Sequence, residues 1–361
     1  MNELVIRTSD RGIYKNCRRK WDFHSKLRQG YQPLVAPEPF EFGTAIHAAL
    51  EVYYEPDFWE ADRSVIRQAA LQCFRDVVAE HRRNYLKFIK QEDMSIEKEE
   101  EFEARLTLGT GMLEHYFEWA PTMDNFTPRK VEIEFEVPVL DPQGEPAFRR
   151  YVDDDGCVVD TPIVYQGRVD LLIEDQRGHY WIVDHKTAAQ FGGTDHLDMD
   201  EQCGSYIWAL RRMLQLPIAG VIYNQLLKSV PKPPSELVNG GFSKNRQQRT
   251  TYEVYLKTLK EYGENLDPYM EFLEFLKDKG NTFFRRLQVN RTPYEITQLG
   301  HQIYKEAMEM TNPVVPIYPN PGMFNCMGCA YRQPCMAIND GSDVNWILNE
   351  QYIKETDNDT N

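Results

Sequence analysis

Residues 166–186 read Gln-Gly-Arg-Val-Asp-Leu-Leu-Ile-Glu-Asp-Gln-Arg-Gly-His-Tyr-Trp-Ile-Val-Asp-His-Lys, and this stretch decides the fold. Two apolar runs, Val169–Ile173 and Tyr180–Val183, flank a polar turn that contains Gly178. Short apolar runs joined by a turn with glycine are typical of a β-hairpin. We therefore predict two paired strands here.

The predicted hairpin carries two acids and a lysine. Asp170 lies near the start of the first run, and the second run ends in Asp184-His185-Lys186. Alternate residues of a strand point to the same face, so Asp184 and Lys186 should project together, with Asp170 across from them. Such a convergence is costly unless a cation and an anionic substrate use it. A cluster of surface ion pairs at a strand end is the alternative.

The bulk composition is that of an ordinary globular protein. The chain has 361 residues, of which 42% are hydrophobic and 27% charged, enough for one large domain or one domain with an insertion. It contains no apolar run of eighteen residues and no charged segment followed by a long apolar stretch at its N-terminus. We therefore expect no membrane span, no secretory signal and a cytoplasmic location, where seven reduced cysteines are no difficulty. The composition leaves the oligomeric state open.

The net charge of −15 argues against tight non-specific binding to nucleic acid. A local basic groove can nevertheless coexist with an acidic exterior. Near residues 281–286, aromatic side chains beside arginines suit stacking on bases and neutralising phosphates, although a packed amphipathic segment is equally compatible with the pattern. The candidate DNA contacts are Arg18, Arg19, Lys244, Arg246, Arg285 and Arg286.

Two helices are expected near the N-terminus. Ser9 is a plausible cap for a helix that runs through Cys17, and Thr44 for a helix that carries His47 in its first turn. Taken alone, Cys17 would be a small buried residue and His47 a core histidine. Residues 62–120 then have a helical pattern throughout.

A strand with one acidic face is expected at residues 131–137. Apolar residues there alternate with Glu132, Glu134 and Glu136, and this period of two is typical of a strand. One of the glutamates could approach the acids of the hairpin. Alternatively, all three could form a solvent-facing edge.

The segment after the hairpin predicts a βαβ crossover. A helix from Glu201 to Leu214 precedes an apolar strand at Ile218–Leu227, so the sheet should combine a parallel pair with the antiparallel hairpin. Gln202 and Tyr206 should share one face of the helix. A long loop at residues 228–250 follows, and then a further helical region.

Three cysteines near the C-terminus indicate a metal centre. Cys326, Cys329 and Cys335 follow the spacing C-x2-C-x5-C in a loop with glycine and proline. Structural zinc and cubane iron–sulfur clusters take four ligands. The best fourth candidate is Cys17, more than three hundred residues away, because the other three cysteines lie in contexts typical of core, loop and helix. Such a staple is reasonable since loop-closure entropy grows only logarithmically with length. Four unrelated thiols are the alternative.

Taken in their order along the chain, these motifs resemble the RecB-like branch of the PD-(D/E)xK nuclease superfamily. The likeness is greatest to its members with a four-cysteine [4Fe–4S] cluster, namely the CRISPR-associated exonuclease family, the AddB nuclease domain and phage-encoded relatives. Many members have proline where this chain has Arg18. The matching signals, in order, are Cys17-Arg-Arg-Lys-Trp, Gly43-Thr-Ala-Ile-His47, Gly167-Arg-Val-Asp170, Asp184-His-Lys186, the helix with Gln202 and Tyr206, and the C-terminal cysteine trio.

The resemblance implies an α/β fold with a restriction-endonuclease-like core. It implies a mixed central β-sheet flanked by helices, large helical insertions, and a cysteine-ligated cluster that joins the N- and C-terminal segments. We expect one domain over residues 1–353 and a disordered tail at 354–361. Within the domain we expect a helical insertion at about 57–120, a nuclease core at about 129–230, a helical region at about 250–310, and a cluster-binding segment at 319–338 together with Cys17.

The resemblance also implies the site residues. The ligands of a [4Fe–4S] cluster would be Cys17 and the C-terminal cysteine trio. Mg²⁺ or Mn²⁺ would be held by Asp170, Asp184, the imidazole of His47 and the backbone carbonyl of His185. Lys186 would position the attacking water or stabilise the transition state. The residues that orient the lysine, the metal ligands or the substrate phosphate would be Gln202 and Tyr206.

These expectations describe a metal-dependent DNA exonuclease. It would act on single strands or duplex ends in recombination, repair or phage DNA processing, in a bacterial or phage-infected cell. Two alternatives are a non-catalytic DNA-end-binding or CRISPR-adaptation factor that uses the same scaffold, and a nuclease subunit that works only with a helicase, recombination or CRISPR-adaptation partner. The chain has no Gly-x-x-x-x-Gly-Lys-Ser/Thr motif and so no helicase motor of its own.

Overall fold

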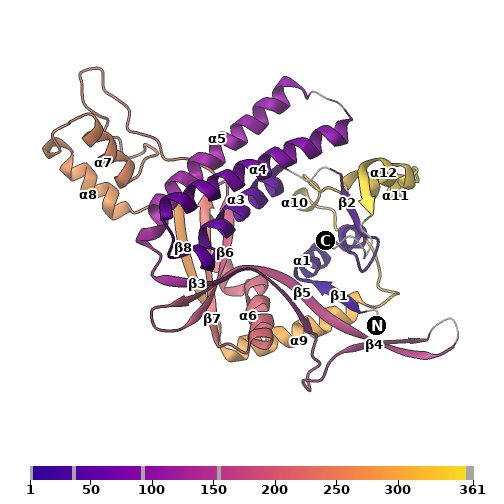
Figure 1. Cartoon of the computed structure of the whole chain (residues 1–361). Helices are drawn as coiled ribbons and strands as arrows, with labels where there is room; N and C mark the ends of the chain where they lie inside the picture. The colour runs from indigo at the N-terminus through magenta and orange to yellow at the C-terminus, as the bar shows by residue number, and fades with distance from the viewer. Residues whose placement is uncertain (1–2, 35–37, 91–93, 153–155, 355–361) are drawn as a thin grey trace.

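The structure, a computed structural model, describes residues 3–34, 38–90, 94–152 and 156–354 (Figure 1). Among these residues, seven strands form one mixed sheet with helices on both faces. The fold class expected from the sequence, α/β with a mixed central sheet, is confirmed. Residues 355–361 of the expected tail lie outside the described residues. Lys354 ends a short strand.

The predicted hairpin is at the centre of this sheet. β5 (Val158–Asp175) and β6 (Tyr180–Ala188) run antiparallel, and Gly178 occupies the turn with a φ of 81°, a left-handed conformation that favours glycine. β7 (Ile218–Leu227) lies parallel to β6, with α6 (Glu201–Leu214) as the crossover. The βαβ prediction is therefore confirmed.

The long strand β5 pairs with three further strands. β3 (Phe126–Pro138) runs antiparallel along its second half, β1 (Leu4–Arg7) pairs in parallel with its middle, and β4 (Phe148–Val152) pairs with its beginning. On the other side, β8 (Phe284–Asn290) closes the sheet beside β7. The sheet order is therefore β1-β5-β6-β7-β8, with β3 and β4 also on β5.

Each face of the sheet has its own apolar core. One face packs against α3 (Glu38–Tyr54), α4 (Arg63–Ile89) and α5 (Ile96–Trp119), which confirms the helical pattern expected over residues 62–120. The opposite face packs against α1 (Thr8–Asn16), α6 and α9 (Pro293–Met310). None of the described helices is both long enough and apolar enough to cross a lipid bilayer.

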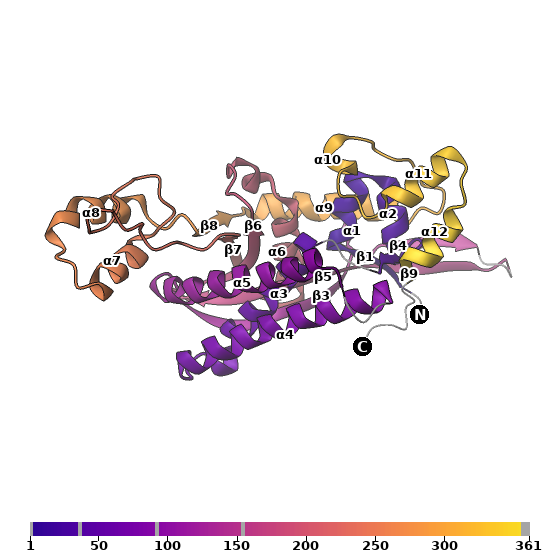
Figure 2. The ribbon, with the colours of Figure 1, turned by 90° about the horizontal axis from the view of Figure 1, so that it is seen from above.

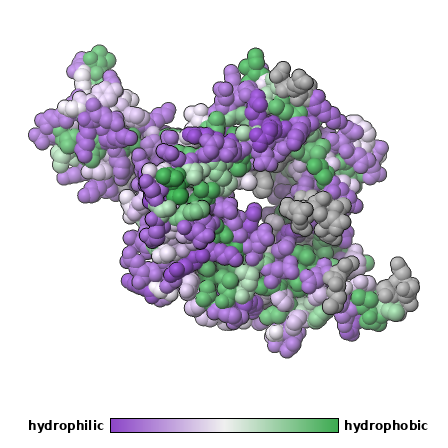
Figure 3. Space-filling model, viewed as in Figure 1, coloured by the Kyte–Doolittle hydropathy of each residue, from purple (hydrophilic) through white to green (hydrophobic). Residues whose placement is uncertain are grey.

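A small lobe projects from the sheet between β7 and β8. It contains α7 (Tyr252–Glu261) and α8 (Met270–Lys279), and its residues form a separate apolar cluster. Figure 2 shows this lobe extending from one end of the molecule. The face of the lobe seen in Figure 3 is mostly hydrophilic.

The two ends of the chain meet at the opposite end of the molecule. α2 (Arg18–His24) lies beside α10 (Met323–Cys326), α11 (Arg332–Asp340) and α12 (Val344–Gln351) (Figures 1 and 2). Phe23, Tyr331, Leu348 and Tyr352 form their shared core. β2 (Tyr31–Pro33) also pairs with β9 (Tyr352–Lys354).

Both helix starts predicted near the N-terminus are wrong. β1 leads directly into α1, so Arg7 takes the N-cap position, Ser9 lies inside the helix, and the helix ends before Cys17. Cys17 has extended backbone between α1 and α2. Thr44 lies in the interior of α3, which begins at Glu38, and His47 is in its third turn.

Close packing of α6 on α9 holds the helix that carries Gln202 and Tyr206. A Cβ added to Gly300 of α9 would lie 2.4 Å from Nε1 of Trp208, whose rigid indole is buried on α6. We expect Gly300→Ala to lower the melting temperature because overpacking a core costs about 1–3 kcal/mol. Gly12→Ala is the matched control in α1, where nothing lies within 4 Å of the added Cβ. The control should be neutral or stabilising, and equal effects would contradict this packing.

Candidate active site

The two acids and the lysine of the hairpin converge at the carboxyl end of β6. Lys186 Nζ lies 3.1 Å from Oδ2 of Asp184, whose side chain is 4% exposed. The backbone amide of His185 donates a hydrogen bond of 2.7 Å to Oδ2 of Asp170. Asp170 is thereby tied to the neighbouring strand at the position between the other two residues.

α3 brings His47 to this group from the face of the sheet that α3, α4 and α5 cover. Its Nδ1 lies 3.4 Å from Oδ1 of Asp170. Glu132 of β3 joins them, since ligand atoms of His47, Glu132 and Asp170 all lie within 4.8 Å of one another. Glu132 is therefore the glutamate of the acidic strand that approaches the site, whereas Glu134 and Glu136 are exposed.

Glu132 has an unusual backbone for a strand residue. Its φ is 43°, in the left-handed region, while its neighbours Val131 and Ile133 pair with Leu171 and Val169 on either side of Asp170. A non-glycine residue in this region costs about 1–3 kcal/mol, and such residues cluster at functional sites. The Glu132 carboxylate also forms an ion pair of 2.9 Å with Nε of Arg168.

The crossover helix supplies the other wall. Oε1 of Gln202 accepts a hydrogen bond of 3.4 Å from Lys186 Nζ, and its Nε2 donates one of 2.9 Å to the hydroxyl of Tyr206. Asp200 caps the helix by accepting a hydrogen bond from the Gln202 amide. This cap fixes the first turn of α6. It thereby positions a series of side-chain contacts that runs from Tyr206 through Gln202 and Lys186 to Asp184.

Burial and neighbouring charges move the pKa values of this group apart. Burial raises the pKa of Asp184 above its usual range and that of Glu132 to about 7. Burial alone would also raise the pKa of Asp170, but the hydrogen bond and charge of His47 bring it below its usual range. For Lys186, burial would lower the pKa, yet the charges of Asp184 and Asp170 raise it, so the ammonium stays protonated.

The donor set suits a divalent cation. Carboxylate oxygens are the ligands preferred by Mg²⁺ and Mn²⁺, and an imidazole is better tolerated by Mn²⁺ than by Mg²⁺. Asp170, Glu132 and His47 offer ligand atoms close enough for one ion. Asp184 adds a buried carboxylate, whose Oδ2 lies 3.1 Å from the ammonium of Lys186. The residues present therefore fit a divalent-metal site.

The four expected cluster cysteines surround one cavity of about 220 Å³ at the junction of the two chain ends. Cys17 comes from the break between α1 and α2, Cys326 ends α10, Cys329 follows it, and Cys335 lies in α11. Burial raises the pKa of the Cys335 thiol; the charge of Arg19 lowers it, and negative charge on the other three cysteines would raise it. The remaining cysteines, Cys73, Cys157 and Cys203, do not line this cavity.

Arg286, expected as a DNA contact, is instead buried. Its side chain is 9% exposed, and Nη2 lies 2.5 Å from Oδ1 of Asp124. Phe283 and Phe284 are also buried, so the packed alternative for residues 281–286 applies. Arg285 is half-buried and donates a hydrogen bond of 2.6 Å to Gln225. Both arginines of β8 therefore form contacts within the protein.

The other basic candidates lie in two separate places. Arg18 forms an ion pair with Glu309, and Arg19 lines the cysteine cavity. Lys244 and Arg246 are exposed on the projecting lobe. Lys244 donates to the carbonyl of Pro268, and Arg246 lies 3.6 Å from Glu271.

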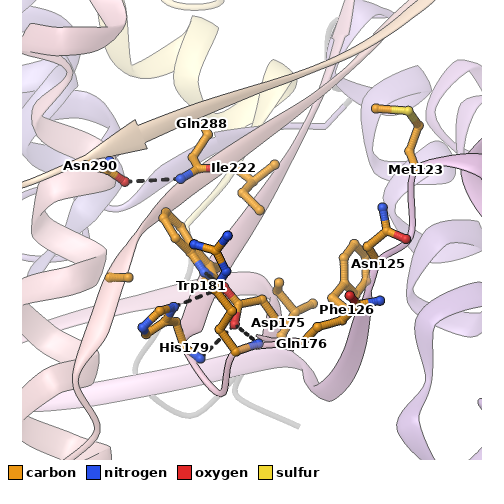
Figure 4. Close-up of a pocket in the computed structure, with 13 residues that line it drawn as sticks. Met123, Asn125, Phe126, Asp175, Gln176, His179, Trp181, Ile222, Gln288 and Asn290 are labelled. Carbon is orange, nitrogen blue, oxygen red and sulfur yellow. Dashed lines mark hydrogen bonds and ion pairs between the residues drawn. The ribbon is translucent and has the colours of Figure 1, made fainter.

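Another cavity, of about 690 Å³, lies at the turn end of the hairpin (Figure 4). Trp181, Asp175 and His179 line it from the hairpin, and Gln288 and Asn290 from β8. The Asp175 carboxylate accepts hydrogen bonds from the indole of Trp181 and from backbone amides of the turn. The Asp175 carboxylate therefore stabilises the turn of the hairpin. The cavity itself lies at the opposite end of β6 from Asp184 and Lys186.

The mixed sheet and its carboxylate–lysine centre define an α/β protein with a candidate divalent-metal site. A family model, PD-(D/E)XK nuclease superfamily, matches residues 12–336. The chain therefore belongs to the PD-(D/E)XK nuclease superfamily. Membership implies a metal-dependent nuclease, a hydrolase that binds DNA.

Twelve chains of solved structures are similar to this one. One, described as "Crystal structure of SSO0001", has 11% sequence identity and a TM-score of 0.28 over 92% of this chain and 85% of that chain. At these values the likeness bears on neither the site nor the activity. No curated protein matches the chain.

The pKa of Glu132 predicts a stability effect that depends on pH. The folded protein holds this proton more tightly than the unfolded chain, since its pKa is about 7 instead of 4.5. The resulting stability is complete below the lower value and is lost as pH rises through the higher one. Metal-free Glu132→Gln should therefore melt above the wild type at about pH 8 and lose this advantage near pH 4.5. A melting-temperature difference that is the same at both pH values would contradict this.

Proposed function

We propose that the protein is a metal-dependent DNA exonuclease that hydrolyses phosphodiester bonds at DNA ends or in single strands. Recombination, repair or phage DNA processing would be its setting. The observation that carries the proposal is the convergence of Asp170, Asp184 and Lys186 with His47 at the end of β6. Membership of the superfamily supports the hydrolysis of nucleic acid.

Asp170, Asp184, His47 and the backbone carbonyl of His185 are proposed to hold the divalent cation. Such an ion, when bound, lowers the pKa of a bound water and stabilises charge that develops on the phosphoryl group. Asp170 and Asp184 would supply hard oxygen donors and negative charge to the ion. Because His47 is hydrogen-bonded to Asp170, its ring is already held beside the proposed ion site.

Lys186 is proposed as the catalytic cation. Its ammonium lies between the Asp184 carboxylate and the Gln202 amide oxygen. The raised pKa keeps it charged, so it can orient the attacking water and stabilise the phosphoryl oxygens in the transition state. Gln202 and Tyr206 would orient this ammonium through their hydrogen bonds.

The cysteine cavity is proposed to hold a [4Fe–4S] cluster. Structural zinc would take the same four thiolates, and the resemblance to nucleases with a four-cysteine cluster favours iron. Cys17, Cys326, Cys329 and Cys335 line one cavity, and four cysteines are the ligand set that a cubane iron–sulfur cluster takes. It would bind α2 to the C-terminal helices.

DNA would reach the site past basic residues outside it. We propose Lys244 and Arg246 on the projecting lobe, and Arg18 and Arg19 beside the cysteine cavity, as DNA contacts. Arg285 is a weaker candidate because Gln225 already accepts from it. Arg286 is not among them because it is buried.

Lys186→Ala and Asp184→Asn should each lower cleavage of end-labelled DNA with Mn²⁺ by about 10²–10³-fold, because each removes a charge from the reacting centre. Lys186→Ala should still bind Mn²⁺ in calorimetry, and Asp184→Asn should bind it more weakly. Lys305→Ala, an exposed change on α9, is the matched control. Full activity of purified Asp184→Asn would refute the assignment.

Linear and circular substrates, single- and double-stranded, separate the remaining alternatives in the same assay. An exonuclease degrades only linear DNA, and labels at each end give its polarity. A DNA-end-binding factor would bind linear DNA without cleaving it. A subunit of a helicase or recombination complex would cleave only after its partner is added.

Cys329→Ser should remove iron and the visible absorbance of the anaerobically purified protein and lower its melting temperature, since the cluster links the two chain ends. Cys157→Ser is the matched control, because Cys157 is exposed and outside the cavity. Iron content and absorbance are the measurements. Stoichiometric zinc without iron in the wild type would rule out the cluster.

A further inference from the structure

A network of buried polar side chains lies behind the candidate metal site and ends on the ring of His185. Nδ2 of Asn224, on β7, lies 2.9 Å from Nδ1 of His185. The same nitrogen donates a hydrogen bond of 2.8 Å to the hydroxyl of Tyr116, on α5. That hydroxyl is 2.7 Å from the hydroxyl of Tyr54, on α3.

A charged pair completes the network at its other end. Arg286 donates from Nη2 to the Tyr54 hydroxyl at 3.0 Å and pairs with Asp124 at 2.5 Å. Its Nε donates to Oδ1 of Asn224 at 3.3 Å. Because Oδ1 accepts from Arg286, the amide nitrogen of Asn224 must face His185. A nitrogen donor there makes Nδ1 the acceptor and leaves the ring proton on Nε2.

Every member of the network is largely buried. Asn224 and Tyr116 are 0% exposed, and His185 is 3% exposed. Burying so many polar groups is costly, and apolar residues of similar size are often as stable as a buried ion pair. Stability alone therefore does not explain why these polar residues are buried here. A better explanation is that the network fixes the position of His185.

The group that it holds is the centre of the metal site. His185 lies between Asp184 and Lys186, and its amide donates to Asp170. Its ring stacks on Tyr54, with centroids 5.8 Å apart, and meets the ring of His47 edge-on at 5.9 Å. Fixing the ring therefore fixes the main chain of β6 at the point from which the acid and the lysine project.

We propose that Asn224, Tyr116 and the Arg286–Asp124 pair are positioning residues of the metal centre, which act by holding the ring and main chain of His185. The proposal rests on the proposed function only in that it names the site as a metal centre. It extends the site from the residues that would touch the ion to a buried layer supplied by α5, β7, β8 and the segment that precedes β3.

Tyr116→Phe tests this layer with a small change. It removes only the hydroxyl that Asn224, Tyr54 and Arg286 share. Loss of residues behind metal ligands commonly weakens metal binding by about 10–100-fold, so we expect a loss of this size in Mn²⁺ affinity, measured by calorimetry without DNA. The matched control is Tyr255→Phe, which removes a buried hydroxyl that donates to Ser243 in the lobe. The control should change the melting temperature without changing Mn²⁺ affinity.

A second variant gives a spectroscopic signature. Asn224→Asp keeps the shape but presents only acceptors to His185, so the ring should carry its proton on Nδ1. The ¹⁵N chemical shifts of His185 should report that exchange. Unchanged shifts in Asn224→Asp, or an Mn²⁺ affinity that Tyr116→Phe leaves at the wild-type value, would overturn the proposal. So would equal losses of affinity in Tyr116→Phe and Tyr255→Phe. If the wild type bound no Mn²⁺, the proposed function would fail, and the shifts would still decide the network.

Discussion

Negative charge gathered in a buried place is the constraint on which this structure depends. Asp170, Asp184 and Glu132 converge at the end of one hairpin, and burial raises the pKa of two of them. The nearby positive groups are Lys186, Arg168 and the imidazole of His47. Protons can relieve this charge only in part, so the arrangement favours a divalent cation. α3 and α6 then serve as walls that keep these acids together.

The same constraint explains how the chain uses its arginines. Several are buried and bound to acids of the protein itself, as Arg286 is to Asp124, Arg105 to Glu41 and Arg11 to Glu306. Buried carboxylates are tolerated only when they are paired in this way. Part of the positive charge of the chain is therefore neutralised inside the fold. A protein with a net charge of −15 must bind its acidic substrate through local groups of basic side chains on its surface.

Local pattern predicted the elements more successfully than their ends. The hairpin, the crossover helix and the long helices between residues 62 and 120 follow from hydrophobic periods that a short window contains. The caps at Ser9 and Thr44 were wrong because α1 begins where the chain leaves the paired strand β1, and α3 already begins at Glu38. A polar residue in a suitable place is not a cap unless tertiary contacts end the helix there.

The sequence by itself determined which residues could do the chemistry. Asp184 and Lys186 had to share a face because the period of a strand is two, and Gln202 and Tyr206 had to share one because they are a helical turn apart. Only the tertiary structure decided that Glu132 faces Asp170, that Arg286 is buried, and that Cys17 meets the C-terminal cysteines. These outcomes depend on contacts between residues far apart in the chain, and on one backbone angle, which no local period encodes.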